Sequence, residues 1–94
     1  MSSDINIDSV FDVETAYEAI REVTTRTATS EIKKLAAAME PIVEEYRNID
    51  NPLYEDTKYL VGLENGTRKE VLGLVKQIRK SLKGLVQYKK WINS

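Results

Sequence analysis

One long helical pattern near the C-terminus restricts the fold more than any other feature of this sequence. Thr67 and Glu70 form a capping box, with threonine at the cap and glutamate three residues later. From there to Ile92 apolar residues recur at intervals of three or four, the spacing of one helix face: Val71, Leu74, Val75, Ile78, Leu82, Leu85 and Ile92. At about 1.5 Å per residue, the predicted helix 67–92 is nearly 40 Å long. An element of that length in 94 residues predicts an all-α protein.

Three shorter helical patterns precede it. After a disordered lead-in at residues 1–8, we expect helices at about 9–25, 30–49 and 52–64. The threonine-rich run 24–30 separates the first two, because β-branched and capping residues disfavour a helix interior.

The second helix carries a seam with the spacing of helix-on-helix packing. The seam consists of Ile32, Leu35, Met39, Ile42, Tyr46 and Ile49. Pro41 interrupts it and predicts either a kink or a split of the helix. After the third helix, Asn65 and Gly66 indicate a left-handed C-cap.

These elements predict one domain, 1–94, of three to four helices. A chain of this length has a thin core, so we expect either a closed bundle or a helical hairpin completed by dimerisation. The second seam, on the last helix, consists of Val71, Val75, Ile78, Leu82 and Leu85. Two seams in so short a chain favour a homodimer.

Charge divides the chain into two parts. Residues 1–66 carry 14 acidic and 6 basic side chains, whereas residues 67–94 carry 8 basic side chains and one acid. On a helical wheel the basic residues lie opposite the apolar stripe. This predicted basic face consists of Lys69, Lys76, Arg79, Lys80, Lys83 and Lys90.

The basic face has three interpretations. It is the solvated side of a bundle helix, neutralised by the acidic helices before it; or it binds a nucleic acid or an acidic protein; or it lies on an anionic membrane. We favour the first and expect the membrane least. Trp91 and Tyr88 at the end of the helix are best explained as side chains that close the end of the bundle, with a membrane anchor or a base-stacking platform as alternatives.

The composition excludes most catalytic chemistry. The chain has no cysteine and no histidine, which removes thiolate chemistry, the commonest general base and nearly every transition-metal site. We therefore expect no enzyme activity, no cofactor and no metal. The start, Met1-Ser2-Ser3-Asp4, does not resemble a signal peptide, and no apolar run is long enough to span a membrane, so we expect a cytoplasmic protein.

No family signature is present. The Trp-x-Gly turn shared by small secreted helical hairpins of type VII systems is absent, and no residue string identifies an immunity protein. The sequence predicts a non-enzymatic interaction protein: a small adaptor, assembly or inhibitor component with a protein partner, of the kind that phages and plasmids encode. The alternative is a nucleic-acid-binding accessory protein that uses the basic face.

Overall fold

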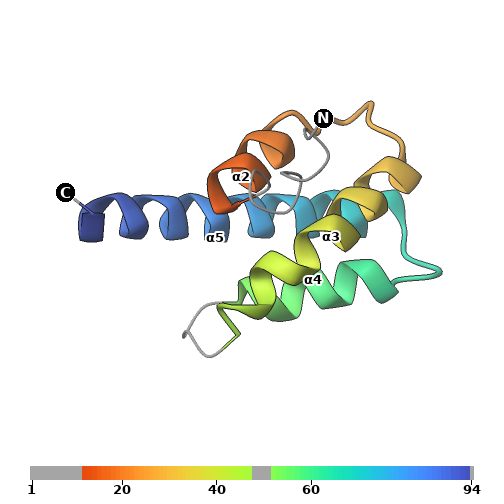
Figure 1. The fold of residues 1–94 in the computed structure, drawn as a ribbon. Coiled ribbons are helices and arrows are strands. Elements are labelled where there is room, and N and C mark those ends of the chain that lie inside the picture. Colours follow the sequence, from red (N-terminus) through yellow and green to blue (C-terminus); the bar gives the residue numbers. More distant parts are fainter. Residues whose placement is uncertain (1–11, 48–51, 94) are drawn as a thin grey trace, which may run out of the picture.

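The computed structural model describes residues 12–47 and 52–93, and this part of the chain contains no strand. Its four helices are α2 (Val13–Arg21), α3 (Thr29–Glu44), α4 (Leu53–Gly62) and α5 (Arg68–Asn93) (Figure 1). The all-α class and the helix number are as predicted. The predicted lead-in, the start of the first predicted helix and the seam residue Ile49 lie outside the described residues.

The boundaries of α2 follow from hydrogen-bonding side chains. Asp12 caps the helix, because its Oδ1 accepts a hydrogen bond from the backbone N–H of Thr15 at 2.9 Å. The helix ends at Arg21, four residues earlier than expected. Beyond it Thr27 Oγ1 accepts from the N–H of Thr24, and Thr24 Oγ1 accepts from the N–H of Arg26. Threonine hydroxyls thus take backbone N–H groups that a longer helix would have used.

Pro41 does not split α3. The helix continues through it to Glu44 and then ends in a turn, in which the N–H of Glu45 donates to the carbonyl of Ile42. Pro41 lacks the N–H that would donate to the carbonyl one turn earlier in the helix. This part of the helix is exposed, so no carbonyl in the core is left without a partner.

The core uses one heptad-like pattern on each helix. Its members are Val13, Ala16, Ile20 and Val23 in and after α2; Ile32, Ala36, Met39 and Val43 in α3; Leu53, Thr57 and Leu60 in α4; and Val71, Val75, Ile78, Leu82, Leu85 and Val86 in α5. The predicted seam of α3 is therefore partly wrong. Leu35, Ile42 and Tyr46 are only half-buried at the edge of the core.

The predicted stripe of α5 is buried up to Leu85, except for Leu74, which is only half-buried at the edge of the core. Its last member, Ile92, was expected to face inward but is 55% exposed. The C-terminal part of α5 extends beyond the other described helices (Figure 1), so none of them covers Ile92. α2 packs mainly on α5, α3 mainly on α4, and α4 also packs on α5.

The turn from α4 to α5 differs from the predicted one. No described residue has a positive φ, so Gly66 is not a left-handed cap. α4 ends where Leu63 becomes extended, and Lys33 Nζ donates to the Leu63 carbonyl at 2.5 Å. Gly66 is needed for space, because a Cβ there would overlap the side chain of Leu63. Thr67 Oγ1 accepts from the N–H of Glu70 at 3.1 Å, as the capping box predicts.

Candidate functional site: the exposed surface of α5

Five members of the predicted basic face are exposed on α5. They are Lys69, Lys76, Lys80, Lys83 and Lys90. Across residues 12–47 and 52–93, the ion pairs are Arg21–Glu18, Arg47–Glu44 and Lys58–Glu40, none of which includes a lysine of α5. Each of these pairs lies within a helix or its end, or between α3 and α4. The favoured interpretation of the sequence required the acidic helices to neutralise these lysines. The described ion pairs show no such direct contact.

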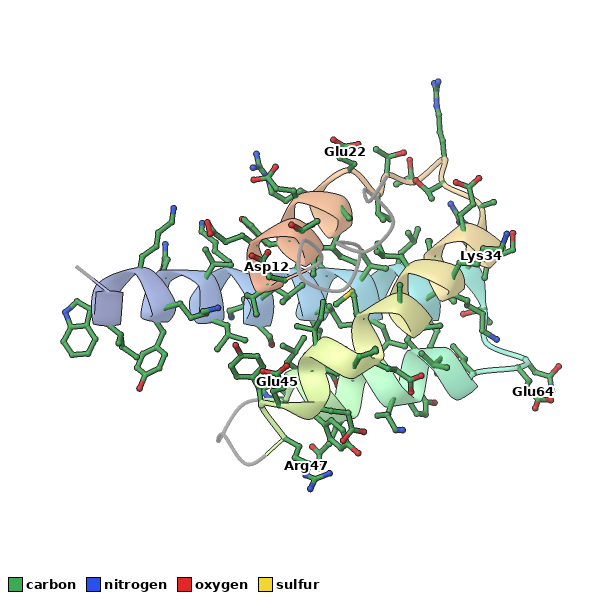
Figure 2. The ribbon with its side chains drawn as sticks, viewed as in Figure 1. Asp12, Glu22, Lys34, Glu45, Arg47 and Glu64 are labelled. Carbon is green, nitrogen blue, oxygen red and sulfur yellow. The ribbon has the colours of Figure 1, made fainter. Side chains whose placement is uncertain are left out.

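Several acidic side chains face solvent around the other helices. Glu22 and Glu64 are exposed and point away from the bundle, as do the basic residues Lys34 and Arg47 (Figure 2). The exposed lysines of α5 therefore keep their positive charge unpaired among the described residues.

The sixth predicted member, Arg79, has a structural role. It is half-buried, and its Nη2 donates to the carbonyls of Ile20 at 3.1 Å and Val23 at 3.0 Å. The Ile20 carbonyl lies in the last turn of α2 and the Val23 carbonyl just after it, where the helix dipole is negative and favours a cation. Arg79 thus ties α2 to α5. The sequence predicted Arg79 on the solvated basic face of α5, because a helical wheel of α5 does not show where the neighbouring helix α2 ends.

The end of α5 exposes three large side chains together. Trp91 is 75% exposed, Tyr88 52% and Ile92 55%. The rings of Tyr88 and Trp91 lie 6.3 Å apart between centroids with a 35° tilt, so they support each other's orientation. We call Tyr88, Trp91 and Ile92 the aromatic tip. The expectation that Trp91 closes the end of the bundle is wrong, because no other described helix reaches it.

Comparison with protein-family models, with curated proteins and with solved structures gives no match.

A cavity of about 580 Å³ lies between the first half of α5 and the α2–α3 linker. Its lining is Val23, Thr24 and Thr25 from the linker side, and Lys69, Leu72, Gly73, Val75, Lys76 and Arg79 from α5. We call it the linker cavity. It has an apolar floor and a cationic rim, and no acidic side chain lines it. Its three basic residues belong to the face predicted from the sequence, whereas the threonines and Gly73 were not predicted, because the fold alone brings the linker against α5.

A second hollow continues along the same helix. It is lined by Pro52, Gly73, Lys76, Gln77, Lys80, Ser81 and Gly84 and has a volume of about 690 Å³. Gly73 and Lys76 belong to both hollows. Gly73 and Gly84 contribute to these hollows because neither has a side chain to fill the space. A Cβ built at either position would meet no atom within 4 Å.

One basic residue outside the predicted face also has a defined place. Lys89 is half-buried and lines a third hollow with Asp12 and Glu45, both labelled in Figure 2. The Thr15 N–H that donates to the Asp12 carboxylate lowers the pKa of Asp12, and the positive charge of Lys89 lowers it further. Lys89 thus interacts with the start of α2 and is less accessible than its neighbours.

The described residues contain no group of three acidic side chains arranged to hold a metal ion. Among the helices of the described chain, none has an apolar stretch that would cross a lipid bilayer.

Proposed function

We propose that this chain is a non-enzymatic protein–protein interaction protein, a small adaptor, assembly or inhibitor component that binds its partner through the end of α5. The observation that supports this is the aromatic tip. Exposed tryptophan and tyrosine are the residue types most enriched at the centres of protein interfaces. Here they project on a helix end that no other described helix covers.

The charges around the tip indicate the partner's chemistry. Lys90 is exposed next to Trp91 in the chain, and Lys83 is exposed about two turns earlier on α5, so this half of the helix combines an apolar patch with positive charge. An apolar groove with an acidic rim complements both features, because helix-in-groove binding buries the apolar residues while the rim charges speed association.

The chain's single tryptophan makes this proposal directly measurable. We expect the fluorescence emission of Trp91 to shift to shorter wavelength when the partner binds, because the indole moves out of water. The partner is to be isolated by affinity capture from the native cell, followed by mass measurement of the intact complex. Ile92→Ser should weaken the complex, whereas Lys34→Ala, an exposed control on α3, should not. A complex that forms with unchanged emission and with full affinity in Ile92→Ser would contradict the proposal.

Nucleic-acid binding is the second candidate, and one observation favours it. The exposed α5 lysines have no ion-pair partner among the described residues, so their charge is available to phosphates. If they bind duplex DNA, affinity should fall with salt with a log–log slope of about −0.9 per phosphate contact. The reversal variant should change Lys76, Lys80 and Lys83 to glutamate and leave Arg79 intact, because Arg79 holds the end of α2.

A salt-sensitive gel shift that the triple reversal abolishes, with helical circular dichroism unchanged, would make nucleic-acid binding the preferred function. Absence of a shift at low salt would leave the protein-partner proposal alone.

A further inference from the structure

We propose that the linker cavity is a binding site for a small phosphate ester, with its phosphoryl group at the cationic rim and its apolar body on the floor. This site is distinct from the aromatic tip and lies on the first half of α5.

Three cationic side chains surround the cavity. Lys69, Lys76 and Arg79 are spaced by about two turns and one turn of α5, so they lie on the same side of the helix. Lys69 and Lys76 are exposed and carry no ion pair in the described chain. With no acid in the lining, the cavity has an unbalanced positive charge that suits a dianion better than a monoanion.

Arg79 adds a cation in a fixed position. Its Nη2 is held by the carbonyls of Ile20 and Val23, which orients the guanidinium in one position. Its Nε–H is buried and has no hydrogen-bond partner among the described residues. This nitrogen is out of reach of a ligand in the cavity, so Arg79 acts on the ligand through the positive charge that its guanidinium adds to the lining.

The opposite wall and the floor add to the selectivity. Thr24 and Thr25 line the linker side, and hydroxyl groups can donate to phosphoryl oxygens. Val23 and Val75 are buried, and Leu72 is half-buried, so the floor is apolar. A ligand that carries a phosphoryl group on an apolar body would satisfy the rim and cover the floor, whereas free phosphate would use the rim alone.

The test titrates phenyl phosphate, inorganic phosphate and benzoate into the full chain and follows backbone amide shifts of Thr24, Thr25 and Gly73 by NMR. We expect saturable shifts with phenyl phosphate and weaker binding of the other two. Lys69→Ala/Lys76→Ala should weaken phenyl phosphate binding about tenfold or more, because charge-assisted hydrogen bonds are lost.

Two further variants separate the site from general charge attraction. Lys83→Ala/Lys90→Ala removes the same charge from the same helix but lies outside the cavity, so binding should be retained. Gly73→Leu places an apolar side chain in the open space beside Gly73 and should block binding without a change of charge. An absence of saturable shifts, benzoate binding as tightly as phenyl phosphate, or equal losses in the two double variants would overturn the proposal.

Discussion

Leu82 and Lys80 are two residues apart on α5 and have opposite surroundings. Leu82 is fully buried in the core, whereas Lys80 is exposed and pairs with no acid in the described chain. We expect Leu82→Ala to lower the free energy of unfolding by about 2–5 kcal/mol, through lost transfer energy and a cavity. Lys80→Ala should change it by less than about 0.5 kcal/mol. Chemical denaturation measures both values, and the reverse ranking would contradict the described orientation of α5.

Asp56 gives one residue-level source of pH dependence. Burial raises its pKa above 3.8, and Glu55 adds to the rise, while its Oδ2 is buried without a hydrogen-bond partner. The folded state therefore binds its proton more tightly than the unfolded state. The contribution of Asp56 to the free energy of unfolding is fully present below pH 3.8, the unfolded value. It is lost as the pH rises through the higher pKa of the folded state.

Asp56→Asn removes that dependence. We expect the stability of the variant relative to the natural chain to increase as the pH is raised from about 3 to 6, because only the natural chain must bury a charge. Urea denaturation at a series of pH values measures the difference. A difference that is constant with pH, or that decreases, would show that the Asp56 carboxylate is not destabilised by burial.

At the scale of elements, α2 depends on a contact from α5. A helix of nine residues is marginal by itself, so it requires its cap at Asp12 and the hydrogen bonds from Arg79 at its far end. We expect Arg79→Ala to cost about 1–3 kcal/mol, as charge-assisted hydrogen bonds to carbonyls are lost. In Arg79→Ala, amide hydrogen exchange should show a larger loss of protection in α2 than in α5. In the control Lys83→Ala, the protection of both helices should be unchanged. Undiminished protection of α2 would contradict this role of Arg79.

The glycines of α5 and of the α4–α5 turn should respond in opposite ways to alanine. Gly84 lies in an exposed helix interior with open space at its Cβ position, so Gly84→Ala should raise stability by about 0.5–1 kcal/mol. A Cβ at Gly66 would overlap the side chain of Leu63, so Gly66→Ala should lower stability. Thermal denaturation of the two variants checks both signs, and equal effects would contradict the described turn.

At the scale of the whole molecule, the predicted seam of α5 is buried within one chain, where Val71 and Ile78 pack into the same core as Ile32 and Met39 of the α3 seam. These residues do not remain available as an interface between copies, so a homodimer, which stays a prediction, would need another surface. The aromatic tip gathers three of the four large hydrophobic side chains that are exposed in the described residues, but Lys90 lies next to it and Lys83 lies on the same half of α5.

Two copies joined at their tips would bring these lysines together. We therefore expect light scattering at micromolar concentration to show a monomer at low salt and increasing association as salt screens the repulsion. A dimer that is stable at low salt and dissociates at high salt would instead indicate contact between the basic α5 of one copy and the acidic helices of another. A mass unchanged by salt and concentration would leave the tip to a different partner.

The sequence by itself determined the helices and most of the core. The capping box at Thr67 and Glu70 and the apolar repeat that follows it depend on neighbours within one or two turns, so the start of α5 and its buried stripe were predictable. Such local signals failed at Gly66, where a glycine serves side-chain packing and not a left-handed turn.

Only the tertiary structure decided how the surface of α5 is used. Arg79 and Lys80 are adjacent and look equivalent on a helical wheel, yet Arg79 binds the end of α2 and Lys80 faces solvent. Whether Trp91 is covered depends on how far the other helices reach along α5, which no local pattern records. The linker cavity likewise exists because Thr24 and Lys76, far apart in the chain, are brought together when α2 packs on α5.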